Sequence, residues 1–170
     1  MTNKGDGISH EHDLNEFVGS AMFSRTFDEG MALVEETARY LDGRGRQEAS
    51  DLPRRGAMLY AGESMRVTTR LMQAASWLLV QRAVHEGEMS VADASSDRYR
   101  LGSKEICFGG RTDGLELLPP TLCDLLERSD NLYRRIARLD DELFGNARRE
   151  SAVHGQMNRL EQAFSEASSA

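Results

Sequence analysis

The chain has 170 residues, of which 39 % are hydrophobic, 6 % aromatic and 29 % charged, and its formal net charge is −7. This length and composition suit one globular domain with loose ends. The negative charge disfavours non-specific binding to nucleic acids or anionic membranes, because both require a cationic surface.

The chain ends and the cysteines predict a cytoplasmic protein. The first residues have no apolar signal-peptide core, and no apolar run approaches the roughly 20 residues of a transmembrane helix. Cys107 and Cys123 form no CxxC motif and have no histidine beside them, so we interpret both as reduced thiols.

The polar, glycine-containing residues 1–20 predict a flexible arm. A first helix is expected at about 22–42, where apolar residues recur at spacings of three and four from Phe23 to Leu41. Gly43 and Gly45 then end it. The turn after this helix is short, so the next helix should run antiparallel to it.

A long second helix is expected at about 53–86, with Pro53 in its first turn and Gly87 at its end. It carries three stripes of side chains. We expect two of them to face the core, and these comprise Met58, Ala61, Met65, Thr68, Met72, Ala75 and Leu79, and Tyr60, Ser64, Val67, Leu71, Ala74 and Leu78. The third stripe is polar at first and apolar later, and comprises Glu63, Arg66, Arg70, Gln73, Trp77, Val80 and Val84.

Residues 88–118 form a long, glycine-rich connection. Within it, the SVAD segment from Ser90 to Asp93 resembles a capping box and predicts a short helix. A third helix follows at about 120–144, where a coiled-coil-like seam comprises Leu122, Leu125, Ser129, Leu132, Ile136, Leu139 and Leu143. Residues 146–170 predict a mobile tail with at most one transient helix.

The expected fold is therefore all-α: an antiparallel three-helix bundle over residues 21–145 with one long central helix. Trp77, Val80 and Val84 lie on that helix beyond the reach of the first helix, and leaving such side chains in water costs roughly 1.5–3 kcal/mol each. Either the 88–118 connection covers them or a second copy of the chain does. We favour the second copy, which makes these three residues the predicted interface of a homodimer.

We find no residues that predict an enzyme, a cofactor site or a metal site. The HEH segment at His10 to His12 offers two imidazoles on an arm that is expected to be flexible. No Ser-His-Asp arrangement or phosphate-binding glycine loop is evident. Asp140 and Asp141 are adjacent in sequence, so they point to different sides of a helix.

Charged clusters are the candidate partner-binding residues. Four arginines surround the first turn, Arg44, Arg46, Arg54 and Arg55, and form a local positive patch for an acidic partner. Glu63, Arg66 and Arg70 lead toward Trp77 on the second helix, and Arg and Trp are enriched in binding hot spots. A third cluster, Arg134, Arg135 and Arg138, is the basis of a nucleic-acid-binding alternative that the net charge disfavours.

Two segments together resemble the alphaproteobacterial RcdA family, the regulators of CtrA degradation. They are LVEETARYLDGRGRQEASDLPR, residues 33–54, and ESMRVTTRLMQAASWLLVQRAVHEGEMS, residues 63–90. The likeness continues more weakly in LPPTLCDLLERSDNLYRRIARLD, residues 118–140.

This resemblance implies a dimeric three-helix bundle with a disordered C-terminal tail. It implies a non-enzymatic adaptor that helps present CtrA or a similar cell-cycle transcription regulator to the ClpXP protease, together with a receiver-domain adaptor. It implies location in the cytoplasm at the cell pole, with no bound nucleotide, no direct nucleic-acid contact and no membrane insertion. The alternative is a helical dimer that regulates a transcription factor directly, without a protease.

Overall fold

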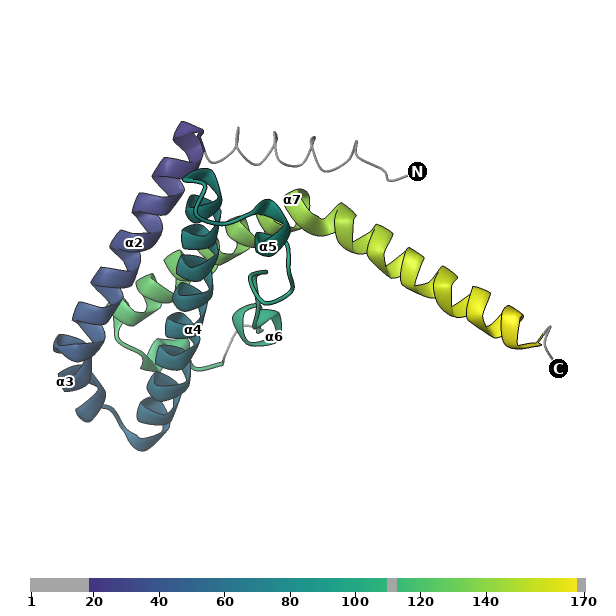
Figure 1. The fold of residues 1–170 in the computed structure, drawn as a ribbon. Helices are drawn as coiled ribbons and strands as arrows, with labels where there is room; N and C mark the ends of the chain where they lie inside the picture. The colour runs from purple at the N-terminus through teal and green to yellow at the C-terminus, as the bar shows by residue number, and fades with distance from the viewer. Residues whose placement is uncertain (1–18, 110–112, 168–170) are drawn as a thin grey trace.

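The computed structural model describes the backbone of residues 19–109 and 113–167 and the side chains of residues 19–109 and 113–145. The predicted flexible arm and the HEH segment thus lie outside the described residues, apart from Gly19 and Ser20. All regular elements in the described ranges are helices (Figure 1), which confirms the all-α prediction. They are α2 (Ala21–Asp42), α3 (Arg44–Ser50), α4 (Arg54–His85), α5 (Val91–Ala94), α6 (Lys104–Cys107), the 3-10 helix η1 (Leu115–Leu117) and α7 (Pro120–Ala167).

Helix α2 begins and ends at local signals, and its end at Gly43 was predicted. The Ser20 side chain caps it by accepting a hydrogen bond from the Phe23 N–H at 3.2 Å. The N–H of Gly43 ends it by donating to carbonyls of the last turn. The predicted turn after α2 contains the short helix α3. A Cβ on Gly45 of α3 would lie 2.8 Å from the Tyr40 carbonyl oxygen, so this close contact requires glycine.

Helix α7 begins at Pro120 as predicted but continues to Ala167, so the predicted end near Phe144 is wrong. The physical reason lies in the composition of residues 146–167. The segment contains no proline and is rich in alanine, arginine, glutamate and glutamine, which are good helix formers. The side chains beyond Gly145 lie outside the described residues.

Helix α2 runs antiparallel to α4, as predicted, and also to α7. Two ion pairs fix its direction relative to α7: Glu29 with Arg135 at 2.7 Å and Glu36 with Arg128 at 2.6 Å. The later residue on α2 pairs with the earlier residue on α7. The two helices therefore run in opposite directions.

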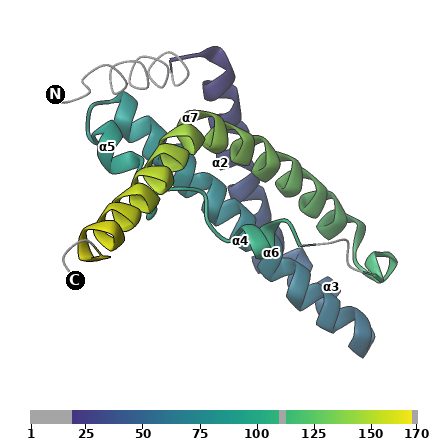
Figure 2. The same ribbon diagram turned by 90° about the vertical axis from the view of Figure 1, so that its right-hand side faces the viewer.

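Helices α4 and α7 run parallel, so the prediction of a fully antiparallel bundle is wrong for this pair. Arg70 pairs with Asp130, and Trp77 donates to Asp140 about two turns further along α4 and nearly three turns further along α7. Figure 2, viewed from the side of the long connection, shows α4 and the first, green part of α7 ascending in the same direction. Parallel neighbours require a connection that returns to the starting end, and residues 86–119 provide it.

The connection descends along α4 from its end to its start. The Gly102 N–H donates to the Gln73 side-chain oxygen at 3.0 Å, halfway down. At the far end, Leu117 lies beside Gly56, in the first turn of α4. Figures 1 and 2 agree that α6 lies against α4 on the side opposite α2. The connection thus covers a surface of α4 for which the sequence analysis offered two possible covers, this connection or a second copy of the chain.

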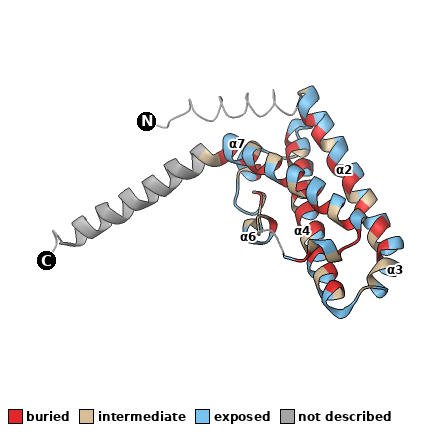
Figure 3. Cartoon of the chain, turned by 180° about the vertical axis from the view of Figure 1, so that it is seen from behind, coloured by how far each residue is buried: buried red, intermediate tan, exposed pale blue. Residues whose placement is uncertain are grey.

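The core lies between α2, α4, α7 and this connection (Figure 3). The α7 seam is confirmed, because its first five members, from Leu122 to Ile136, are fully buried and the last two are partly buried. The capping box is also confirmed, because the Ser90 hydroxyl accepts from the Asp93 N–H at 3.0 Å and begins α5. The stripe of α4 from Tyr60 to Leu78 is largely buried, as predicted. The stripe from Met58 to Leu79, predicted to face the core, is largely exposed, and the stripe from Glu63 to Val84 is buried or half-buried instead.

Candidate functional site

The solvent-facing side of α4 is uncharged over most of its length. Between Arg55 and Arg82, every exposed residue of the helix is neutral, and we call this set the α4 face. It comprises Met58, Ala61, Gly62, Met65, Thr68, Met72, Ser76 and Leu79. The sequence analysis placed most of these residues in the core, and that prediction is wrong: Met58, Met65 and Met72 are 69 %, 72 % and 64 % exposed.

The α4 face has the spacing of a helix-packing surface. Met58, Met65, Met72 and Leu79 are separated by seven residues each, so they lie along one line of the helix. Small residues alternate with them and leave room for close approach. A solvated helix surface normally carries charged side chains. Three exposed methionines in a row therefore indicate an interaction surface.

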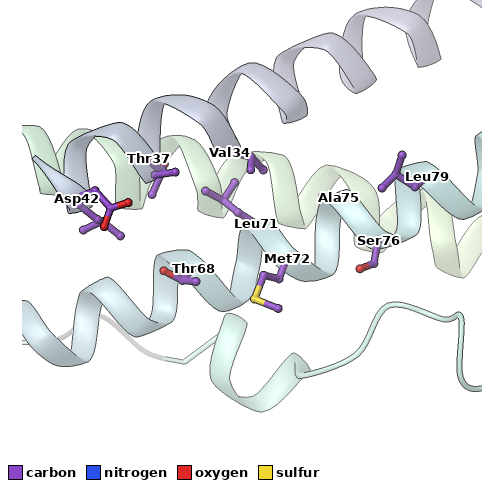
Figure 4. A pocket seen from close by; sticks show the side chains of 11 residues that line it. Val34, Thr37, Asp42, Thr68, Leu71, Met72, Ala75, Ser76 and Leu79 are labelled. Carbon is purple, nitrogen blue, oxygen red and sulfur yellow. The ribbon is translucent and has the colours of Figure 1, made fainter.

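Helix α2 forms the second wall of a groove along the second half of this face, from Thr68 to Leu79 (Figure 4). The groove encloses about 450 Å³. Val34, Thr37, Ala38, Leu41 and Asp42 line it from α2, and Thr68, Leu71, Met72, Ala75, Ser76 and Leu79 line it from α4. Asp42 lies at one end, and its carboxylate is 3.5 Å from the Arg46 guanidinium. The lining is otherwise uncharged, so the groove suits an apolar side-chain ridge rather than a polar small molecule.

The charged residues of α4 are directed away from this face. Glu63 is 4 % exposed and lies 3.2 Å from Arg66. Arg70 is 5 % exposed and donates to the carbonyl oxygens of Cys107 and Leu126 at 2.9 and 3.2 Å. Glu63 and Arg70 therefore expose little of their side chains to a partner, and both contribute to packing within the chain. Arg66 keeps a quarter of its side chain exposed.

Arg70 also pairs with Asp130 at 3.1 Å. Burial lowers the pKa of its guanidinium, and the nearby Asp130 carboxylate acts in the opposite direction. An arginine remains protonated in either case. The arrangement fixes α4, α6 and α7 to one another through a single side chain.

Trp77 is 1 % exposed and Val84 7 % exposed within one chain. The Trp77 indole N–H donates to an Asp140 oxygen at 2.9 Å, and Arg100 from the connection pairs with the same carboxylate at 2.8 Å. Val80 is partly buried against the core. The connection and α7 therefore cover this stripe within one chain, which is the alternative that the sequence offered to a dimer interface at Trp77, Val80 and Val84.

Two of the four arginines around the first turn already form ion pairs within the chain. Arg44 pairs with Glu48 at 2.7 Å, and Arg46 with Asp42. Arg54 and Arg55 are exposed and have no ion pair among the described residues. They line a hollow beside Met58, at the beginning of the α4 face.

The third basic cluster is largely neutralised. Arg135 pairs with Glu29, and Arg134 pairs with Asp130 while its guanidinium lies 5.2 Å from the Phe108 ring centre. In the part of the chain that the structure describes, no three His, Cys, Asp or Glu side chains are placed to hold a metal ion. Within the same ranges, no helix combines the length and the apolar character that crossing a membrane requires.

The sequence contained a signal for the α4 face that the stripe analysis missed. Seven-residue spacing of Met58, Met65, Met72 and Leu79 without an intervening charge suits a core stripe and an exposed docking stripe equally well. The methionine stripe is exposed because the opposite side of α4, with Arg70 and Glu63, is buried. The burial of Arg70 in turn depends on carbonyl oxygens of α6 and α7, which sequence periodicity does not reveal.

Comparison with known proteins shows the family to which the chain belongs. A family described as "Protein of unknown function (DUF1465)" matches residues 14–164. The crystal structure of RcdA from Caulobacter crescentus CB15 is 48 % identical, with a TM-score of 0.62, and the match covers 76 % of this chain and 97 % of that one. This chain belongs to the RcdA-like DUF1465 family. The resemblance seen in the sequence is thereby confirmed. Among the curated proteins, none matches.

Proposed function

We propose that this RcdA-like protein is a non-enzymatic adaptor that helps deliver a transcription regulator, CtrA or a similar substrate, to the ClpXP protease. The observation that carries the proposal is the 48 % identity to RcdA over nearly all of that chain. The partners of the adaptor are a receiver-domain adaptor, the protease and the substrate. It acts in the cytoplasm, at the cell pole.

The surface of the molecule supports a tethering role. An adaptor needs a stable scaffold and at least one docking surface, because its gain is a raised effective concentration of one partner near another. The α4 face and its groove are a candidate docking surface on a well-packed helical scaffold. Homodimerisation remains a prediction.

A reconstituted degradation assay tests the function. Purified unfoldase, peptidase, receiver-domain adaptor and CtrA are mixed with and without this protein, and loss of CtrA is followed over time. We expect faster loss when the protein is present. A substrate that the unfoldase recognises by itself serves as the control and should be degraded at the same rate in both mixtures.

Unchanged CtrA degradation would contradict the adaptor function. If the protein bound CtrA tightly under those conditions without affecting its degradation, the direct regulator without a protease would be the better explanation. Binding is measured by sedimentation of the mixture in the absence of the protease.

A further inference from the structure

A polar cleft lies between α4 and α7, beside the end of α6. It encloses about 500 Å³ and shares no residue with the α4 face. Three arginines line it, although the chain has a net charge of −7. The lining residues that carry its chemistry are Arg66 from α4, Leu115 from η1, and Leu126, Glu127, Asn131 and Arg134 from α7. Guanidinium groups gathered in a cleft favour binding of an anionic group.

Arg134 is held in a fixed orientation and has donors to spare. Its Nε donates to an Asp130 carboxylate oxygen at 2.6 Å, and its guanidinium lies over the Phe108 ring. The Phe108 ring in turn meets the Tyr133 ring edge-to-face, with the ring centres 5.1 Å apart. The two terminal nitrogens of Arg134 make no hydrogen bond with any described residue. A guanidinium fixed in this way is prepared for a bidentate contact with a carboxylate or phosphate.

The charges of the cleft suit a ligand with a single negative charge. Glu63 is buried and lies 3.2 Å from Arg66, and Asp130 lies between the two other arginines. Glu127 is exposed and has no ion pair among the described residues, so its carboxylate is not held in place as the Arg134 guanidinium is. Three arginines and three carboxylates therefore balance. A doubly charged phosphate would be repelled more strongly by Glu127 than a carboxylate would.

One wall of the cleft is apolar. Leu115 is partly buried, Leu126 is largely buried, and Cys123 lies about one turn before Leu126 on α7. An apolar side chain that lies next to the bound carboxylate would be removed from water against this wall. The volume of the cleft falls within the range of small-ligand pockets, roughly 300–1,000 Å³. The space therefore suits the end or a short turn of a polypeptide.

We propose that the polar cleft binds a carboxylate of a partner polypeptide through Arg134, with an adjacent apolar side chain against Leu115 and Leu126. Arg66 adds positive charge from the opposite wall. The carboxylate is that of a C-terminus or of an acidic side chain next to an apolar residue, since both present the same group. This inference deepens the proposed adaptor function and rests on it only for the identity of the partner.

Three N-acetylated peptides test the proposal with the full-length chain. The first is Gly-Ser-Gly-Ser-Ala-Leu with a free C-terminus, the second is its C-terminal amide, and the third is that amide with aspartate in place of alanine. Heteronuclear NMR titration follows the backbone amide of Gly109, which lines the cleft. We expect the amide to bind at least roughly tenfold more weakly than the better of the two carboxylate peptides. That better peptide identifies the source of the carboxylate.

Substitutions locate the site. Arg134→Gln should weaken binding of the better carboxylate peptide at least roughly tenfold. Arg138→Gln removes an exposed arginine of α7 outside the cleft, so it is the matched control and should bind like the wild type.

Two further exposed positions of the cleft should respond with opposite signs. Asn131→Asp adds a negative charge at nearly constant shape and should weaken binding several-fold, whereas Glu127→Gln removes one and should strengthen it. Thermal unfolding of each variant confirms that it is folded. Weaker binding in Glu127→Gln would contradict an anionic ligand.

Equal affinity for the carboxylate peptides and the amide, or equal losses in Arg134→Gln and Arg138→Gln, would overturn the proposal. So would inorganic phosphate that binds more tightly than either carboxylate peptide at the same ionic strength. The adaptor function is judged separately. If CtrA is delivered by a protein that binds none of the peptides, the cleft proposal fails and the adaptor function stands. If the peptides bind as expected and CtrA is not delivered, the adaptor function fails and the cleft proposal stands.

Discussion

Buried charge on α4 is stabilised by residues that are distant in sequence. Arg70 donates to carbonyl oxygens 37 and 56 positions away, and Trp77 donates to a carboxylate 63 positions away. Periodicity compares residues within one helix, so it assigns an arginine to the solvent side by default. This explains why two stripes of α4 were exchanged, whereas the middle stripe, from Tyr60 to Leu78, was predicted correctly.

Asp140 is the residue whose loss should cost most among the described carboxylates of α7. It is 1 % exposed, and Asp140→Asn leaves the Arg100 guanidinium without its counter-ion. We expect the free energy of unfolding to fall by roughly 3 kcal/mol, as for other broken buried ion pairs. Unfolding in guanidinium chloride, followed by Trp77 fluorescence, measures this free energy, because Trp77 is the single tryptophan.

Asp141→Asn is the matched control for that experiment. Asp141 is exposed, and its carboxylate lies 3.3 Å from the Lys104 amine. An exposed pair contributes about 0–1 kcal/mol. Equal destabilisation by the two variants would show that the Asp140 pair is no more stabilising than a surface contact.

Two glycines should respond to alanine with opposite signs. A Cβ on Gly62 meets no atom within 4 Å, and helix propensity favours alanine over glycine by about 1 kcal/mol. Gly62→Ala should therefore raise the melting temperature. Gly45→Ala should lower it, because its Cβ would meet the Tyr40 carbonyl oxygen at 2.8 Å and the Tyr60 hydroxyl at 2.5 Å. Calorimetry of both variants checks the signs.

At the scale of elements, sequence predicted the helices better than their arrangement. The expected starts of α2, α4 and α7 lie within one residue of the observed ones, because local signals such as the Ser20 cap set them. The direction of α7 was predicted wrongly, because the length of a connection alone does not determine whether the next helix runs parallel or antiparallel to the previous one. Hydrogen bonds such as that from Gly102 to Gln73 fix the returning path.

The contact between α2 and α7 should depend on pH. A hydrogen bond from Arg128 lowers the pKa of the Glu36 carboxyl below its ordinary value. A carboxyl with a lowered folded-state pKa stabilises the fold above its unfolded pKa, about 4.3 for glutamate, and this contribution is lost as the pH falls through the folded-state value. Glu36→Gln should therefore cost roughly 0.5–1 kcal/mol at pH 7, because the pair is partly exposed, and less in acid.

Urea unfolding at several pH values measures this difference. Glu35→Gln is the control, because Glu35 pairs with Arg39 inside α2 and joins no two elements. A Glu36→Gln deficit that stays constant down to pH 2 would contradict the ionic origin of the effect.

At the scale of the whole molecule, the described core ends before the last part of α7. Phe144 is the last buried side chain in the described ranges, and Arg100 lies 5.1 Å from its ring centre. A chain that ends at residue 150 should therefore melt within a few degrees of the full chain. A chain that ends at residue 140 loses Phe144 and should be less stable by about 3–5 kcal/mol.

Thermal unfolding by circular dichroism compares the two truncations. A large drop for the chain ending at residue 150 would mean that residues beyond Gly145 are docked on the domain. Sequence composition alone predicted the boundary of the domain near residue 145, and this experiment tests it.

The parallel arrangement of α4 and α7 has a consequence for the order of folding. The α2–α4 hairpin closes through a short loop, whereas α7 can dock only after more than thirty residues have traced their way back along α4. Trp77 reports the later event, because its Asp140 partner belongs to α7. In a stopped-flow refolding trace, tryptophan emission should therefore reach its final value after the far-ultraviolet ellipticity of the helices has largely developed.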